Sequence, residues 1–207
     1  MRTRNDVYVM MDVEASGTRL GHHDLIQFGA VAAWGTNLEH QLAFPAHKPK
    51  PDVPANLVVP HFRGDPDPAA LKVTGLRWDD VLAYGEAPAA FVDRFYGWVG
   101  LLKQASGAEK VILTGHGVTF DWAMTKLLYD AYRGDWPCHY SGLDFKSWYG
   151  GRCNLEYIDS SMTEMQKEFG LRPNKHKHDA QADADHQFKL MLLAFRASGF
   201  VANSVTP

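Results

Sequence analysis

The alternation of apolar and polar residues predicts three strands near the start of the chain. Residues 7–12 are an apolar run too short for a helix, which is typical of a buried central strand. Residues 25–34 and residues 38–44 predict a second and a third strand. Because side chains alternate between the two faces of a strand, the third strand should carry on one face Leu38, Leu42 and Phe44. Because short connections join the three runs, we expect antiparallel neighbours in one sheet.

Apolar residues spaced by three and four predict helices later in the chain. One helix should begin near Pro88 and bury a stripe made of Phe91, Phe95, Trp98 and Leu102. The last helix should end at Gly199 and bury a stripe made of Ala184, Phe188, Met191, Leu192 and Phe195. Between them, Ser161 and Glu164 form a capping box that opens a short helix ending at Gly170.

Shorter segments complete the predicted order of elements. Residues 111–114 predict a buried strand, and residues 122–132 predict a helix after the glycine-rich turn at residues 115–117. A further strand is expected near residues 138–143. Strands and helices in this order predict one α/β domain on a mixed sheet, spanning residues 1–207 with a core at about 7–198.

Residues 45–68 hold seven of the 11 prolines and predict a long loop. These prolines are Pro45, Pro49, Pro51, Pro54, Pro60, Pro66 and Pro68. Loops of this length are usually functional excursions or disordered segments. Contact with a substrate and a plain surface insertion are both open interpretations.

Length and composition agree with a single globular domain. Of the 207 residues, 45% are hydrophobic and 22% are charged, and no apolar run approaches the roughly 20 residues that cross a bilayer. The polar N-terminus has no small-residue cleavage site, so no signal peptide is expected. Cys138 and Cys153 form no CxxC pair, which argues against a zinc ribbon or a disulfide framework. We expect a cytoplasmic, reduced protein without membrane contact.

Asp12 and Glu14 lie where the first predicted strand ends. Residues i and i+2 of a strand point to the same face, roughly 6–7 Å apart. Two such carboxylates repel each other and lose hydration, and a cation between them would relieve both penalties. The residues that follow are small, namely Ala15, Ser16, Gly17 and Thr18. Their size would let a ligand approach the backbone closely. The alternative is that the strand frays into solvent here.

Asp121 opens the helix that follows the glycine-rich turn. A strand, a turn and a helix in this order place its carboxylate at the edge of the sheet, where sites of α/β proteins tend to form. Aspartate is also favoured in the first turn of any helix. A plain helix cap is therefore the alternative.

His178 and Asp183 are five positions apart near the start of the last helix. On a continuous helix they would point about 140° from each other. They converge if His178 lies in the loop before the helix and Asp183 lies one turn inside it. Residues 172–177 have the composition of a loop, which agrees with that arrangement. An ordinary solvated helix start is the alternative.

Together, these segments resemble the three motifs of the DEDDh 3′–5′ exonucleases, the DnaQ-like branch of the ribonuclease-H-like superfamily. The motif residues in this chain are Asp12 and Glu14, then Phe120 and Asp121, then His178, Ala180 and Asp183. The resemblance covers about residues 7–195. It implies a ribonuclease-H-like mixed sheet, with three antiparallel strands followed by parallel strands, flanked by helices.

The resemblance also implies roles for the motif residues. Asp12, Glu14, Asp121 and Asp183 would hold two Mg²⁺ or Mn²⁺ ions, which prefer oxygen ligands. His178 would take a proton from the attacking water, since imidazole has a reference pKa near 6.5. The reaction would release 5′-mononucleotides from the 3′ end of a single strand or an overhang.

A narrower resemblance bears on the substrate. Residues 118–122, 143–148 and 177–180 are similar to stretches of the mycobacterial-type 3′–5′ exoribonucleases, which implies RNA. A proofreading-like 3′–5′ exodeoxyribonuclease with the same chemistry is the alternative. A non-catalytic nucleic-acid-binding protein on the same fold is another, although all five site residues are present. Many family members have Asn four residues before the second-motif Asp, where this chain has Gly117.

Substrate contacts are expected around the motifs. By resemblance, the backbone at residues 15–18 would seat the 3′-terminal nucleotide. Trp122, Trp148 and Tyr149 could stack on bases, and Lys177 with its neighbour Lys175 could meet phosphates. The alternatives are core aromatic residues and solvated loop lysines. The resemblance leaves open a homodimer.

The net charge of −3 does not argue against a nucleic-acid substrate. Removing the four motif carboxylates from the 24 acids leaves 24 − 4 = 20, against 21 Lys and Arg. Two divalent cations would neutralise those four. A zinc protein using His22, His23, His176 and His178 is a further alternative, but the chain lacks cysteines at metal-ligand spacing.

Overall fold

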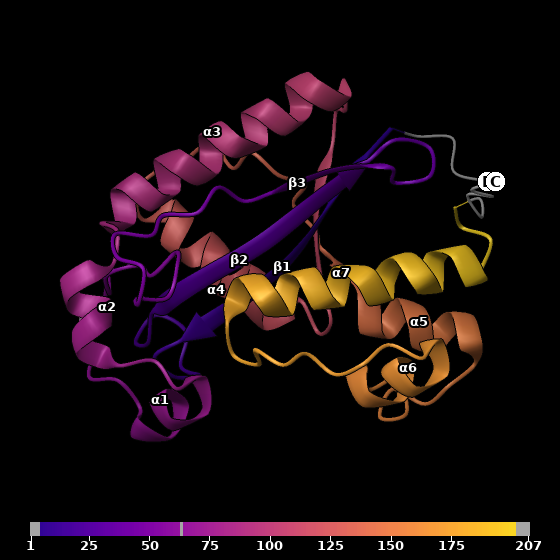
Figure 1. The fold of residues 1–207 in the computed structure, drawn as a ribbon. Coiled ribbons are helices and arrows are strands. Elements are labelled where there is room, and N and C mark those ends of the chain that lie inside the picture. Colours follow the sequence, from indigo (N-terminus) through magenta and orange to yellow (C-terminus); the bar gives the residue numbers. More distant parts are fainter. Residues whose placement is uncertain (1–4, 63, 202–207) are drawn as a thin grey trace.

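A five-stranded mixed sheet forms the centre of the molecule (Figure 1). The computed structural model describes residues 5–62 and 64–201, so the first four residues of the polar N-terminus lie outside the described part. The strands, in the sheet order β3-β2-β1-β4-β5, are β3 (His40–Ala43), β2 (Leu25–Trp34), β1 (Val7–Ala15), β4 (Val111–Gly115) and β5 (Leu143–Asp144). The pairs β1–β2 and β2–β3 are antiparallel, whereas β1–β4 and β4–β5 are parallel. This confirms the predicted fold class.

Helices cover both faces of this sheet. They are α1 (Pro68–Thr74), α2 (Trp78–Tyr84), α3 (Pro88–Ser106), α4 (Thr119–Asp130), α5 (Phe145–Cys153), α6 (Met162–Phe169) and α7 (Ala180–Ala197). One hydrophobic core lies between the sheet and the pair α3 and α4, and a second lies between the sheet and α5, α6 and α7. Figure 1 shows α1 and α2 at the end of the sheet where β1 terminates. Of the helices in the described ranges, none has the length and apolar character needed to cross a membrane.

The alternation of side chains along β1 determines on which face of the sheet Asp12 and Glu14 lie. Val7, Val9, Met11 and Val13 belong to the core under α3 and α4. Tyr8 and Met10 belong to the core under α7. By period two, Asp12 and Glu14 continue the second row, so their side chains lie on the α7 face of the sheet.

Several elements differ from the sequence prediction. β3 is shorter than residues 38–44, because Leu38 adopts a left-handed φ of 57° in the preceding turn. The expected common face of three residues is not formed: Leu38 joins the core under α7, Phe44 joins the core under α3 and α4, and Leu42 is 39% exposed. β5 has only two residues, although the segment before it still runs beside β4, where His139 N–H donates to the Val111 carbonyl. Helix α4 begins at Thr119 and not at Trp122. Helices α1, α2 and α5 were not predicted.

The predicted helical stripes are confirmed. The stripe of α3, which begins at Pro88 as expected, is buried, and so is the stripe of α7. Ser161 caps α6 by accepting the Glu164 N–H, and Gly170 ends that helix in a left-handed conformation.

Candidate active site

Asp12 and Glu14 stand side by side at the carboxyl end of β1. The Glu14 side chain is buried, with 8% of its residue surface exposed, and Asp12 is half-buried. β1 pairs with β4 only as far as Met10, so the last residues of β1 extend beyond the parallel ladder. The two carboxylates therefore lie at an open edge of the sheet, on the face covered by α7.

Asp121 reaches the same edge from the opposite helical layer. It lies in the first turn of α4, and its Oδ1 accepts the backbone N–H of Val13 at 2.9 Å. This bond supplies an acceptor to β1 where the pairing with β4 has stopped. Asp121 therefore lies at a helix start, as the alternative interpretation had it, and the first turn of α4 also delivers its carboxylate to β1.

His178 and Asp183 converge as expected, with His178 just before α7 and Asp183 in its first turn. Asp179 caps the helix by accepting the Ala182 N–H at 3.0 Å. His178 adopts a left-handed φ of 65°, which turns its backbone N–H toward Asp183 Oδ2 at 2.6 Å. Asn174 donates to the other oxygen, Oδ1, at 2.8 Å. Both oxygens of the Asp183 carboxylate are therefore oriented by the loop before the helix.

The start of α7 lies directly against β2. A side chain at Gly29 would place its Cβ 2.2 Å from the carbonyl carbon of Ala180, so only glycine permits this approach. Gln181 accepts from the N–H of Ala30 and donates to its carbonyl, both at 3.2 Å. Gln27 accepts the Ala180 N–H at 3.3 Å. These contacts bring the third motif within reach of the first.

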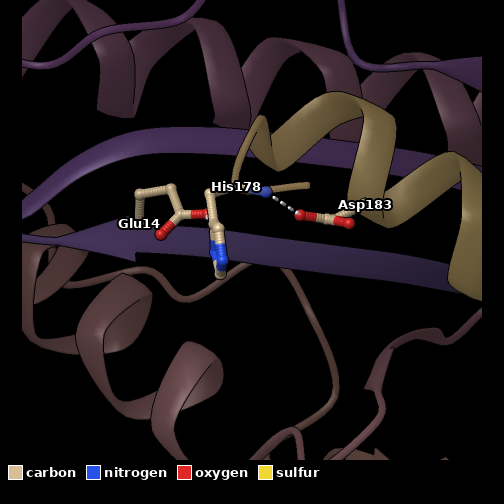
Figure 2. A group of neighbouring side chains, drawn as sticks. All are labelled: Glu14, His178 and Asp183. Atoms are coloured by element: carbon tan, nitrogen blue, oxygen red, sulfur yellow. Dashed lines mark hydrogen bonds and ion pairs between the residues drawn. The ribbon is translucent and has the colours of Figure 1, made fainter. Parts of the chain in front are cut away.

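Figure 2 shows Glu14 from the sheet and Asp183 from α7 on either side of His178. Potential ligand atoms of these three residues all lie within 4.8 Å of one another, and His178 Nδ1 is 3.9 Å from Glu14 Oε1. Over the described residues, this is the one group of at least three His, Cys, Asp or Glu side chains close enough to hold a metal ion. Asp12 and Asp121 do not belong to it, although the charges of Asp121, Glu14 and Asp183 all act on Asp12. The alternative zinc set of four histidines is not formed.

Burial raises the pKa values of three motif carboxylates, and repulsion between carboxylates adds to the effect at Asp12 and Glu14. Burial raises the pKa of Asp12 well above its usual value, and Asp121, Glu14 and Asp183 raise it further. Burial, followed by the charges of Asp183 and Asp121, raises the pKa of Glu14 from 4.5 to about 7. Burial raises the pKa of Asp121 to about 6, against the lowering effect of the Val13 N–H. The four motif carboxylates offer oxygen donors and unbalanced negative charge, which fits hard divalent cations such as Mg²⁺ or Mn²⁺.

A pocket of about 380 Å³ opens beside Glu14. Its lining is mainly apolar and consists of Val13, Glu14, Ala15, Gly17, Thr18, Asp67, Ala69, Ala70, Val73, Thr74 and Phe120. The Pro-rich loop reaches the pocket through its end at Asp67, whose N–H donates to the Ser16 carbonyl at 2.7 Å. The long loop therefore lines the pocket only at this end.

The other expected substrate contacts are placed differently. The Ser16 side chain is fully buried, and its hydroxyl accepts the Asp24 N–H, so the pocket is lined by the residues on either side of it. The indole of Trp122 packs on Trp136 against the core. Trp148 and Tyr149 belong to the core under α7. Lys177 is exposed next to His178.

Among the described residues, two side chains outside the predicted set donate hydrogen bonds to the motif carboxylates. Asn174 contacts Asp183, and Gln187 donates to Asp12 Oδ1 at 2.7 Å. Gln187 lies among the buried residues of α7, beside Ala184 and Phe188. A polar amide on an otherwise apolar helical stripe is the sequence signal that could have identified it.

The fold and the motif arrangement have counterparts among known proteins. No family model matches the chain. The 3′-5′ DNA exonuclease Cap18 of Escherichia coli is 27% identical over 199 residues, which are 96% of this chain and 96% of Cap18. The nuclease domain of 3′hExo, a DEDDh family member solved with rAMP, superposes with a TM-score of 0.72 at 15% identity and covers 95% of both chains. E. coli Exonuclease I with a dT13 oligonucleotide gives a TM-score of 0.67 at 18% identity, over 94% of this chain and 42% of that one.

The resemblance inferred from the three motifs is therefore confirmed: the chain has the DnaQ-like, ribonuclease-H-like fold of the DEDDh 3′–5′ exonucleases.

Proposed function

We propose that this protein is a divalent-metal-dependent 3′–5′ exonuclease that removes 5′-mononucleotides from the 3′ end of a nucleic-acid strand. The observation that carries the proposal is the convergence of the motif residues at one edge of the sheet, next to a pocket of about 380 Å³. A cluster of buried acids has no structural benefit by itself, because each added charge raises the pKa of its neighbours.

In phosphodiester hydrolysis, the four carboxylates and the histidine would have different roles. Asp12, Glu14, Asp121 and Asp183 would hold two divalent ions, which supply positive charge to the phosphoryl oxygens and the leaving 3′-oxygen. His178 accepts the proton of the water that attacks phosphorus. Its side chain is 46% exposed, so its ring is open to water in the cleft.

The pocket beside Glu14 seats the terminal nucleoside. Ala69, Ala70, Val73 and Phe120 give it apolar walls suited to a sugar face or a base plane. Few polar side chains line it, and direct readout of a base needs donors and acceptors at its edges. We therefore expect removal of all four nucleotides at similar rates.

Two substrates are supported by different observations. The relative that aligns over 96% of the chain is named a DNA exonuclease, and this whole-chain similarity favours DNA. RNA, the substrate implied by three short stretches of sequence, is the second candidate. We give DNA precedence because the similarity that supports it spans all three motifs.

The decisive experiment uses DNA and RNA strands of one sequence, labelled at the 5′ end. With Mg²⁺ or Mn²⁺, we expect a ladder shortening from the 3′ end, 5′-mononucleotides as products, and faster decay of the DNA strand. Asp183→Asn is the matched inactive control. Faster decay of RNA would select the second candidate, and no decay of either strand would refute the proposal.

Polarity is tested with blocked ends. Seating of a free 3′-hydroxyl predicts that a 3′-phosphorylated strand is degraded slowly, whereas a 5′-phosphate has little effect. Circular single strands should survive. Rapid cutting of circles would instead identify an endonuclease.

A further inference from the structure

The Gln187 side chain links three parts of the site. It lies on α7, one turn beyond Asp183, and only 9% of the residue is exposed. Its Nε2 donates to Asp12 Oδ1 at 2.7 Å, and its Oε1 accepts the backbone N–H of His116 at 3.0 Å. One amide on α7 thus connects this helix to β1, which carries Asp12, and to the turn at His116 before α4, which carries Asp121.

The orientation of this amide is fixed by its two partners. The backbone N–H of His116 can only donate, so it must face the carbonyl oxygen of Gln187. An ionised Asp12 can only accept, so it must face the NH₂ group. His116 is itself held in place, because its ring Nε2 lies 3.0 Å from the carbonyl of the fully buried Ser160. Rotating the amide by 180° would break both bonds.

The bond fixes how Asp12 presents its carboxylate. With Oδ1 held by Gln187, rotation about the last side-chain bond of Asp12 is restricted, and Oδ2 keeps a defined direction. An amide N–H stabilises the ionised carboxylate without bringing a positive charge. A lysine or arginine at this place would compete with a divalent cation for Asp12, whereas glutamine does not.

We propose that Gln187 is a positioning residue that holds the Asp12 carboxylate in the orientation needed to bind a divalent cation. The inference rests on the proposed function, in which Asp12 is a metal ligand. Partners of metal ligands that do not touch the ion typically contribute 10–100-fold to metal affinity or activity. A buried glutamine that only satisfied the fold would contribute to stability and leave metal affinity unchanged.

The test measures metal binding without nucleic acid. Gln187→Met keeps the length and volume of the side chain and removes both hydrogen-bonding groups. Mn²⁺ titration followed by calorimetry or by the EPR signal of free Mn²⁺ should show affinity roughly 10–100-fold weaker than in the wild type. Exonuclease activity should need correspondingly more Mn²⁺ and should recover substantially at saturation.

Gln166→Met is the matched control. It removes a side-chain amide that contacts His186 between α6 and α7, whereas the amide that contacts Asp12 is that of Gln187. This variant should bind Mn²⁺ like the wild type. Thermal unfolding in EDTA reports any loss of fold in either variant. If Gln187→Met cannot be folded, Gln187→Asn, which is too short to span Asp12 and His116, takes its place.

The outcomes separate this inference from the proposed function. Wild-type Mn²⁺ affinity in the folded Gln187 variant would overturn the positioning role, and so would a loss of affinity that the Gln166 variant shares. A wild-type protein that binds Mn²⁺ but degrades no strand would refute the exonuclease proposal. In that case the affinity comparison would still decide the role of Gln187.

Discussion

His178 combines an uncommon backbone conformation with an exposed side chain. Non-glycine residues rarely adopt a φ of 65°, and such strain of about 1–3 kcal/mol is typically retained where function needs it. Here it lets the backbone N–H orient Asp183 while the ring faces Glu14. The backbone and the side chain of one residue therefore serve two parts of the site.

We expect His178→Ala to lower kcat by about 10²–10⁴-fold, because the general base is lost. The substrate KM and the Mn²⁺ affinity should change much less, since the backbone N–H remains. Single-turnover degradation of a labelled strand measures this. His176→Ala, in the same exposed loop, is the control and should keep wild-type activity. If His176→Ala is the damaging change, the base is assigned to the wrong histidine.

The raised pKa values predict how pH affects the stability of the metal-free protein. The pKa of Glu14 rises from 4.5 to about 7, and that of Asp121 rises from 3.8 to about 6. An acid whose pKa is higher in the folded than in the unfolded state stabilises the fold below its unfolded pKa. That contribution is lost as pH rises through the folded pKa. In EDTA, Tm should therefore fall as pH increases from about 4.5 to 7.

Asp12→Asn tests the cause of that fall. Removing the Asp12 charge, whose pKa burial and three neighbouring carboxylates raise, should flatten the decline of Tm with pH. The variant should melt above the wild type at pH 7.5 in EDTA. Each kcal/mol regained corresponds to roughly 2–4 °C for a chain of this size. Asp79→Asn, at an exposed position on α2, should leave the slope unchanged. An equally steep decline in Asp12→Asn would show that the motif acids do not cause it.

At the level of single residues, the sequence predicted the positions of the motif residues better than the positions of the aromatic residues beside them. Asp12, Asp121 and His178 occupy the expected places because strand alternation and helix starts fix where such side chains point. Trp122 could not be placed in the same way. An aromatic residue beside a motif has the same local pattern whether it faces the core or a substrate, and here it packs on Trp136.

Among the elements, the longer helices could be predicted from the sequence, whereas the shortest helices could not. α3 and α7 have 19 and 18 residues, and their apolar stripes repeat often enough to be recognised. α1 and α2 have seven residues each, fewer than three repeats of the pattern, and α1 buries none. β5 has only two residues and depends on the neighbouring β4 for its pairing. Short elements fixed by tertiary contact leave little periodicity in the sequence.

The contact of α7 with β2 yields a prediction at this scale. Gly29→Ala would set a methyl group against Ala180, so the start of α7 must shift. We expect a destabilisation of about 1–3 kcal/mol from overpacking and a loss of kcat of roughly 10²-fold, because displacements near 1 Å misalign a site. Chemical denaturation and single-turnover rates measure the two effects.

Gly97→Ala is the control for that substitution. Gly97 lies in the middle of α3, and a Cβ there would meet no atom within 4 Å. Alanine should be neutral or stabilise the helix by up to about 1 kcal/mol, with unchanged activity. Wild-type activity in Gly29→Ala would mean that the tight packing of α7 on the sheet does not position the third motif.

At the scale of the whole molecule, the site joins three elements that the sheet alone does not hold together. β1 contributes two acids, α4 contributes one from the layer on one face, and α7 contributes one from the layer on the other. A cation bound by all of them would therefore connect both helical layers to the central strand. Ligands that bind only the folded state stabilise it by RT ln(1 + [L]/Kd).

Metal binding should therefore be visible in global unfolding as well as in catalysis. We expect Mg²⁺ or Mn²⁺ to raise the Tm of the EDTA-stripped protein at pH 7.5, by an amount that grows with the logarithm of concentration. At 100 times Kd the stabilisation is about 2.7 kcal/mol. Asp183→Ala, which removes the ligand from α7, should abolish most of this increase and also the activity.

Strand degradation should stop in EDTA, return with Mg²⁺ or Mn²⁺, and return only weakly with Ca²⁺, whose looser geometry suits an in-line reaction poorly. Full activity in EDTA would contradict the assignment of the four carboxylates as metal ligands. An equal rise of Tm in wild type and Asp183→Ala would show that the ions bind elsewhere on the molecule.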